Sequence, residues 1–295
     1  MEQADLCGTG VALVSPFYED GSIDFLSLEK IVEYVINGGV DYIVVMGTTG
    51  ESATINKNEK KLIVDKIVEI NNGRLPLVYG IGGNNTMAVV DTIKSTDLSP
   101  FSAILSVSPY YNKPGQEGIY RHFKYISENC DKPIILYNVP GRTAQSISAS
   151  TTLKLARECE NIVAIKEASG DLVQISEIIK YKPDDFMVIS GDDALTFPMM
   201  ALGGCGVISV VANVLPSIFS KMVRFANEQN FSEAKNIHLK LIDFIGLLFQ
   251  EGSPAGIKAA MHIKGLLKNE VRLPLVSTSE SLYHKIASEL KKMEA

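Results

Sequence analysis

The hydrophobic residues of this chain gather in eight short runs that are apolar almost throughout and do not alternate with polar residues. Strands covered on both faces have this pattern, whereas strands with one solvated face alternate. Between the runs lie longer segments whose apolar residues recur with helical spacing, such as 27–38, 58–72 and 146–160. The predicted strands lie within residues 10–16, 41–47, 75–82, 102–109, 132–140, 161–169, 185–193 and 203–211.

Eight strand-and-helix units match the size of a (β/α)8 TIM barrel, and a doubly wound open sheet is the rival fold. The nearest candidate for the dinucleotide loop of such a sheet is residues 80–85, but Asn85 replaces the last glycine of that fingerprint, so we predict a turn between a strand and a loop. After residue 228 only helices are predicted, over 231–251, 254–269 and 277–293. The expected fold class is therefore α/β, with a barrel over 1–228 and a C-terminal helical domain over 229–295.

The composition is that of a soluble globular protein, with 46% hydrophobic and 21% charged residues. A net charge of −6 gives no basic field for a nucleic acid. The N-terminus lacks the features of a secretory signal, and no apolar run approaches the roughly 20 residues of a membrane span. Four cysteines without a C-x-x-C pair predict reduced, mostly buried thiols. We expect a cytoplasmic protein with neither nucleic acid nor membrane as partner.

In a TIM barrel the functional residues follow the C-terminal ends of the strands. All four histidines lie in predicted helices, where we expect them to be partly exposed, so a histidine triad or histidine-bound metal is not predicted there. Asp192 and Asp193 alone are too few for a magnesium site. Chemistry without a metal is favoured. The polar residues at the ends of the predicted strands or just after them include Thr48, Thr49, Tyr111, Tyr137, Arg142 and Lys166.

Lys166 directly follows the apolar run of residues 162–165. Loss of solvation disfavours the charged form of a lysine, and a neutral amine attacks carbonyl carbons to form a Schiff base. Tyr137 closes the neighbouring run at the same height, and the loss of water that forms an imine requires such a proton donor. Alternatively, Lys166 pairs with Glu167 or a loop acid, and Tyr137 is part of the core.

Two further segments are suited to binding carboxylates. The hydroxyls and N–H groups of residues 47–50 can hold a small carboxylate, or the segment can be a helix N-cap with Glu51 in the first turn. Arg142, in a Pro-Gly turn, can bind a second carboxylate through two hydrogen bonds, or it can face water.

Six segments in order along the chain resemble the pyruvate-dependent class I aldolase family, which contains dihydrodipicolinate synthase and N-acetylneuraminate lyase. They are GTTGESAT at 47–54, SPYYNKP at 108–114, YNVPGRT at 137–143, IKEASG at 165–170, SGDD at 190–193 and GVISVVANV at 206–214.

This resemblance implies that Lys166 forms a Schiff base with pyruvate and that Tyr137 is its proton donor and acceptor. It implies a proton relay of Thr48, Tyr137 and a Tyr111 that enters the pocket of a partner subunit. Thr49 and the backbone of Ile208 would bind pyruvate, and Arg142 would bind L-aspartate 4-semialdehyde. The implied product is 4-hydroxy-tetrahydrodipicolinate, made for lysine and diaminopimelate biosynthesis by a homotetramer without a cofactor.

The alternatives are a lyase or aldolase of the same family acting on sialic acid or a 2-keto-3-deoxy sugar acid, and a barrel that binds a keto acid without turnover. Family lyases typically have GSTGE, K-x-T and no arginine at this position, whereas this chain has GTTGE, KEAS and GRT, which favour the synthase. Lys57, Lys60 and Ala88 stand where lysine-inhibited relatives have histidines and a glutamate. We therefore predict weak or absent inhibition by lysine.

Overall fold

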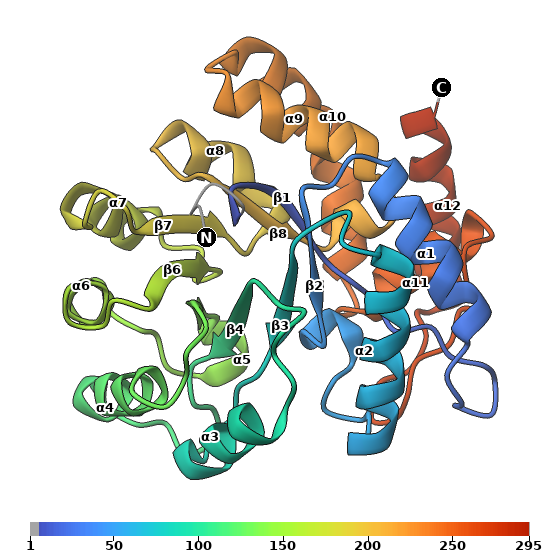
Figure 1. The fold of residues 1–295 in the computed structure, drawn as a ribbon. Helices are drawn as coiled ribbons and strands as arrows, with labels where there is room; N and C mark the ends of the chain where they lie inside the picture. Colours follow the sequence, from blue (N-terminus) through green and yellow to red (C-terminus); the bar gives the residue numbers. More distant parts are fainter. Residues whose placement is uncertain (1–5, 295) are drawn as a thin grey trace.

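The computed structural model describes residues 6–294, in which eight parallel strands close into a barrel in sequence order (Figure 1). β1 is hydrogen-bonded both to β2 and to β8, so the sheet is closed and the open-sheet alternative is excluded. The strands are β1 (Gly8–Ala12), β2 (Tyr42–Val45), β3 (Leu77–Gly80), β4 (Ala103–Val107), β5 (Ile134–Asn138), β6 (Ile162–Glu167), β7 (Met187–Ser190) and β8 (Gly206–Ser209).

Helices surround the barrel, as Figure 1 shows, and confirm the predicted (β/α)8 fold. Three short 3-10 turns follow strand ends, at Thr48–Gly50, Asp193–Leu195 and Val211–Asn213. The helices are α1 (Phe25–Asn37), α2 (Lys57–Asn71), α3 (Thr86–Ser95), α4 (Gln116–Ser127), α5 (Pro140–Thr143), α6 (Ala149–Glu158), α7 (Leu172–Tyr181), α8 (Thr196–Ala201), α9 (Pro216–Asn227), α10 (Phe231–Phe249), α11 (Ala255–Ile263) and α12 (Glu280–Glu294).

The strands are apolar throughout because both of their faces are buried. In β5, Ile135 and Tyr137 join a cluster of residues from the strands that fills the barrel interior. Their neighbours Ile134 and Leu136 join a second cluster, between the barrel and the helices. Alternate residues of a strand point to opposite faces, so the position of each residue along the strand decides which cluster it joins.

The first strand is shorter than predicted. It ends at Ala12 and not at Ser15-Pro16. Beyond it the amide of Asn213 replaces the strand ladder, donating to the Ala12 carbonyl at 2.9 Å and accepting from the Val14 N–H at 3.2 Å. A side chain almost 200 residues away satisfies these backbone groups, which no local pattern could indicate.

The three predicted C-terminal helices are present as α10, α11 and α12 and contact one another. α11 ends at Ile263, earlier than predicted, because Gly265 adopts a left-handed conformation with φ 69°. Phe244, Ile257 and Ile286 belong to the same hydrophobic cluster as the barrel helices. That residues 229–295 form a domain of their own stays a prediction.

Two of the histidines differ from expectation. All four lie in helices, but His122 and His238 are buried. Each occupies a core-facing position of its helix; His122 lies on the face of α4 that carries Ile119 and Ile126. The four cysteines are free thiols, either buried or half-buried.

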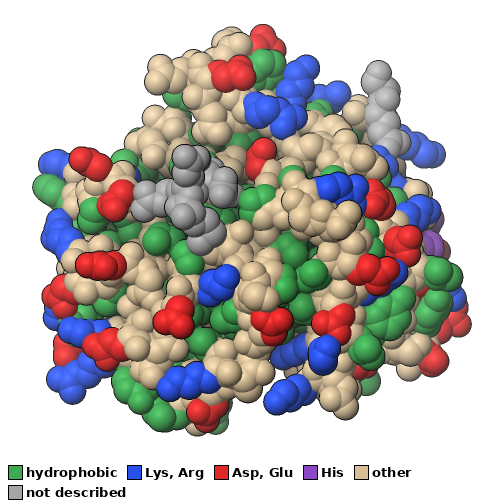
Figure 2. Space-filling model, viewed as in Figure 1, with side chains coloured by type: hydrophobic (Ala, Val, Ile, Leu, Met, Phe, Trp, Pro, Cys, Tyr) green, Lys and Arg blue, Asp and Glu red, His purple; other side chains and the backbone are tan. Residues whose placement is uncertain are grey.

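Within residues 6–294, no helix is long and apolar enough to cross a membrane. The expectation that the N-terminus is not a secretory signal rests partly on residues 1–5, which lie outside the described residues. On the face shown in Figure 2, acidic and basic side chains of the described residues are interspersed.

Candidate active site

Lys166 and Tyr137 face each other inside the barrel. They are register partners on β6 and β5, and the Nζ of Lys166 lies 4.3 Å from the centroid of the Tyr137 ring. Only 6% of Lys166 and 8% of Tyr137 are exposed. The structure therefore places a sheltered amine beside a phenol at the C-terminal end of two neighbouring strands, where TIM barrels carry their active sites.

Glu167 is not the partner of Lys166. As the next residue of β6 it points to the opposite face, where it accepts hydrogen bonds from Asn138 at 2.7 Å, Ser169 at 3.1 Å and Gln174 at 3.1 Å. Burial raises the pKa of the Glu167 carboxyl, although these donors oppose the effect. No ion pair of Lys166 is present within residues 6–294, which leaves the amine available for chemistry.

Gly191, just after β7, makes room for the lysine. A Cβ atom at this position would lie 2.9 Å from Cε of Lys166 and 2.8 Å from Cβ of Ala168. The N–H of Gly191 donates to the carbonyl of Glu167 at 2.7 Å. The backbone directly after β7 thus lies against the aliphatic part of Lys166. In the sequence, the only sign of this contact is a glycine directly after a predicted strand.

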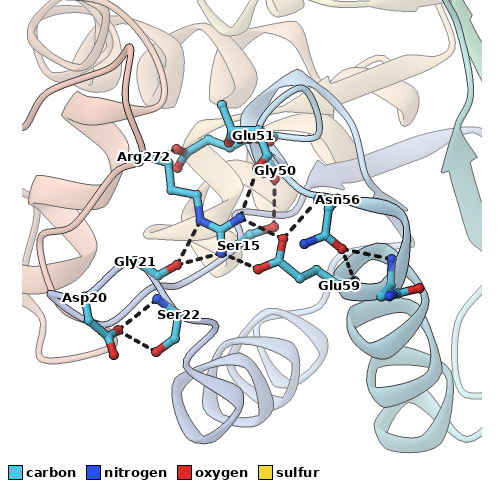
Figure 3. A network of polar contacts seen from close by, with 11 residues as sticks. Ser15, Asp20, Gly21, Ser22, Gly50, Glu51, Asn56, Glu59 and Arg272 are labelled. Carbon is cyan, nitrogen blue, oxygen red and sulfur yellow. Dashed lines mark hydrogen bonds and ion pairs between the residues drawn. The ribbon is translucent and has the colours of Figure 1, made fainter.

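The segment after β2 is a compact turn. Thr48–Gly50 forms a single 3-10 turn, in which Thr49 is buried and Thr48 is exposed. Ser15 donates a hydrogen bond of 2.8 Å to the carbonyl of Gly50 (Figure 3). Glu51 ends the turn in a left-handed conformation with φ 53°, so the alternative with Glu51 in the first turn of a helix is wrong. The next helix, α2, begins only at Lys57.

Ile208 lies in β8 and is buried in the same interior cluster as Tyr137. The loop after it is held by Asp193, whose Oδ2 accepts from the N–H groups of Val210 at 3.0 Å and Val211 at 3.1 Å. Burial raises the pKa of Asp193 to about 6. Sequence reasoning missed this structural role, because the acid and the amides it binds are separated by a whole β/α unit.

Tyr111 and Arg142 are exposed in this single chain. Tyr111 is 89% exposed, in a left-handed conformation with φ 71° in the loop after β4. The described residues contain no hydrogen bond between Tyr111 and Tyr137. Arg142, in α5 after β5, donates from Nη2 to the Ser253 carbonyl at 3.3 Å, a contact that leaves most of the guanidinium free for a ligand.

Residues 6–294 contain no cluster of three or more histidine, cysteine or acidic side chains that could hold a metal ion. The chemistry that the site can perform with its own groups is nucleophilic attack by an amine, with proton transfer by a phenol.

A closed barrel with a buried lysine next to a tyrosine at its C-terminal end defines the class of Schiff-base-forming TIM barrels. Comparison with known proteins places the chain more narrowly. It belongs to the dihydrodipicolinate synthetase family, whose model matches residues 5–293.

Individual relatives are similar over almost their whole length. The chain is 55% identical over 279 residues to the 4-hydroxy-tetrahydrodipicolinate synthase of Flavobacterium psychrophilum, covering 95% of each protein. It superposes on dihydrodipicolinate synthase from Aquifex aeolicus with a TM-score of 0.94, at 43% identity and over 98% of both chains. The chloride-inhibited enzyme from Acinetobacter baumannii, solved in complex with pyruvate, is 38% identical with a TM-score of 0.95, over 98% of this chain and 99% of that one.

Proposed function

We propose that this chain is a lyase that condenses pyruvate with L-aspartate 4-semialdehyde to give 4-hydroxy-tetrahydrodipicolinate, for lysine and diaminopimelate biosynthesis. The observation that carries the proposal is the Lys166 amine beside the Tyr137 phenol, sheltered in the barrel of a member of this family. A relative of the same fold was crystallised with pyruvate, which supports a keto acid as the first substrate.

The first half of the reaction builds the nucleophile. Nζ of Lys166 attacks C2 of pyruvate to form a carbinolamine, and the C2 hydroxyl leaves as water after accepting a proton from Tyr137. The resulting protonated imine draws electrons from the methyl carbon, whose proton passes to the Tyr137 phenolate as the enamine forms. The lysine itself is the electron sink, so the proposal requires no cofactor.

The second half uses the enamine and closes the ring. The enamine carbon attacks the aldehyde carbon of the second substrate and forms a C–C bond. The amine of that substrate then attacks the imine carbon, and the bond to Lys166 breaks as the ring closes. We assign the carboxylate of pyruvate to Thr49, contact near the pyruvyl group to the backbone of Ile208, and the carboxylate of the aldehyde to Arg142.

Proton transfer to solvent requires further hydroxyls. We assign Thr48 and Tyr111 to a relay with Tyr137, with Tyr111 reaching the pocket of a partner subunit. The 89% exposure of Tyr111 in the single chain supports a role at a subunit interface. This arrangement requires at least a dimer, and we propose a cytoplasmic homotetramer built as a dimer of dimers.

The direct test is mass spectrometry after incubation with pyruvate and borohydride. Reduction of the imine should leave a stable adduct on Lys166, and Lys166→Ala should show none. Turnover assays with pyruvate plus either aspartate semialdehyde or N-acetylmannosamine then separate the synthase from a sialic acid lyase. An adduct without turnover of either aldehyde would point instead to an aldolase for a 2-keto-3-deoxy sugar acid or to a barrel that binds a keto acid without turnover.

A further inference from the structure

A buried ion pair links the C-terminal helices to the turn that follows β2. Lys258 of α11 donates through Nζ to a carboxylate oxygen of Glu51, and the side chains are 0% and 1% exposed. The same Nζ also donates to the carbonyl of Glu270 at 2.8 Å and lies 4.1 Å from the centroid of the Phe17 ring. A cation without solvent is retained in such a position only when it is fully partnered.

The second oxygen of Glu51 is also bound. It accepts a hydrogen bond of 2.9 Å from the backbone N–H of Arg272. The guanidinium of Arg272 contacts the surrounding loops, donating to the carbonyls of Gly21 and Thr54 and to both carboxylate oxygens of Glu59 (Figure 3). Lys258 and Arg272 thus connect the C-terminal part of the chain to Glu51 and to the neighbouring residues Thr54 and Glu59.

Glu51 is well placed to transmit this constraint to the site. It directly follows Thr48–Gly50 and adopts a left-handed conformation that is unfavourable for a residue with a side chain. Next to it, Ser15 donates a hydrogen bond to the carbonyl of Gly50. The C-terminal end of the turn that carries Thr48 and Thr49 is therefore held by buried polar contacts at two consecutive residues, Gly50 and Glu51.

The pKa of Lys258 indicates that the buried amine depends on its ion pair with Glu51. Burial lowers the pKa of Lys258 to about 8, and the carboxylate of Glu51 counteracts this effect. Without Glu51 the amine would have no ion-pair partner among residues 6–294, since its other direct contacts are a backbone carbonyl and an aromatic ring.

We propose that Lys258 and Glu51 are positioning residues for pyruvate: through their buried ion pair, the C-terminal helices orient the Thr48–Gly50 turn so that Thr49 meets the substrate carboxylate. This inference rests on the proposed function of the Thr48–Gly50 turn. It gives the C-terminal segment a part in substrate binding in addition to its packing on the barrel.

The test compares Lys258→Met and the double variant Glu51→Met/Lys258→Met with Lys292→Met as a matched control. The control makes the same change at an exposed lysine of α12 that pairs with Glu289. The double variant is the central one, because it leaves no unpaired charge and buried ion pairs are often replaceable by apolar residues without loss of the fold. Circular dichroism and Tm report the fold.

The decisive measurement is the pyruvate concentration that gives half-maximal borohydride trapping on Lys166. We expect it to rise by about ten-fold or more in the double variant, since small misplacements of a binding group are costly. The KM for aspartate semialdehyde, bound at Arg142, should change by less than about two-fold. Lys292→Met should match the wild type in both.

An unchanged half-saturation for pyruvate in a folded double variant would overturn the inference, even if its Tm were lower, because the pair would then support only the fold. Should both variants be unfolded, the isosteric Glu51→Gln is measured in the same way and decides the question. Failure of the proposed Schiff base with pyruvate is distinguishable, since the wild-type protein itself would then trap no pyruvate; failure of the synthase reaction alone would show as trapping without turnover of aspartate semialdehyde.

Discussion

Asn138 donates a hydrogen bond of 2.7 Å to Glu167, one residue beyond the facing pair of Tyr137 and Lys166 on the same two strands. The two pairs point to opposite faces of the sheet, one into the barrel and the other toward the helices. The oxygen of Asn138 also accepts from the N–H of Ile147 at 2.9 Å. The hydrogen bond between Asn138 and Glu167 outside the barrel thereby fixes the strand register that brings Tyr137 and Lys166 together inside it.

We expect Glu167→Leu to lower the free energy of unfolding by about 1–3 kcal/mol, because the amides of Asn138 and Gln174 would remain buried without an acceptor. Glu167→Gln keeps an acceptor oxygen and should cost less. Denaturant unfolding of the three proteins measures the difference. Equal stability of the two variants would show that the acceptor is unimportant.

Tyr137→Phe removes one hydroxyl and leaves the ring over Lys166. Turnover should fall by about 10²- to 10⁴-fold, the usual contribution of a positioned proton donor, while Tm stays near the wild-type value. Tyr79→Phe is the control, since Tyr79 is similarly buried in β3 but belongs to the cluster outside the barrel. Full turnover by Tyr137→Phe would remove the phenol from the mechanism.

Gly191→Ala tests the close approach of β7 to the lysine. The new methyl group would lie 2.9 Å from Cε of Lys166, so the amine must move. We expect slower borohydride trapping of pyruvate by a protein that still folds. Gly115→Ala, with no heavy atom within 4 Å of its new Cβ, should trap pyruvate at the wild-type rate.

Arg142→Lys tests the carboxylate site for the second substrate. Lysine keeps the charge but loses the two-pronged geometry, and hydrogen bonds to charged groups contribute about 1.5–3 kcal/mol. We expect the KM for aspartate semialdehyde to rise by about 10- to 100-fold with normal trapping of pyruvate. A defect in trapping alone would place Arg142 in the pyruvate site instead.

His122 should make the stability of the protein sensitive to acid. Burial lowers its pKa from 6.5 to about 4, and its Nδ1 shares a hydrogen bond of 2.8 Å with the Thr86 hydroxyl. Between these two pH values the unfolded chain binds a proton that the folded protein does not, so stability is complete above about pH 6.5 and falls as the pH drops toward 4.

The full effect of His122 corresponds to on the order of 3 kcal/mol. Unfolding free energies of the wild type and His122→Leu at pH 7 and pH 4.5 isolate it, since other titrating groups, such as Asp193, act in both proteins. The difference in unfolding free energy between the wild type and His122→Leu should shift in favour of the variant at low pH. The same difference at both pH values would mean that His122 does not titrate in this range.

The barrel was predictable because strands buried on both faces leave a clear apolar run, and the order of eight such runs leaves few closed arrangements. The meeting of Tyr137 and Lys166 followed from their equal positions at the ends of neighbouring runs. Both predictions use only patterns that are local or repeat from one unit to the next.

Contacts across distant parts of the chain were not predictable in this way. In the sequence, nothing distinguishes Lys258 from an exposed lysine of an amphipathic helix. Only the packing of α11 shows that it is buried against Glu51. The same is true of Asp193, which binds amides of the next unit, and of His122, whose helix turns it toward the core. In each case a tertiary contact decides the environment of a polar residue.

Because β1 bonds to β8, every strand of the barrel has a neighbour on both sides. A free strand edge is the usual template on which copies of a chain add to one another as extended sheets, and this sheet offers none. Association of this protein with itself must therefore proceed through helices and loops, and not through the addition of strands to the sheet.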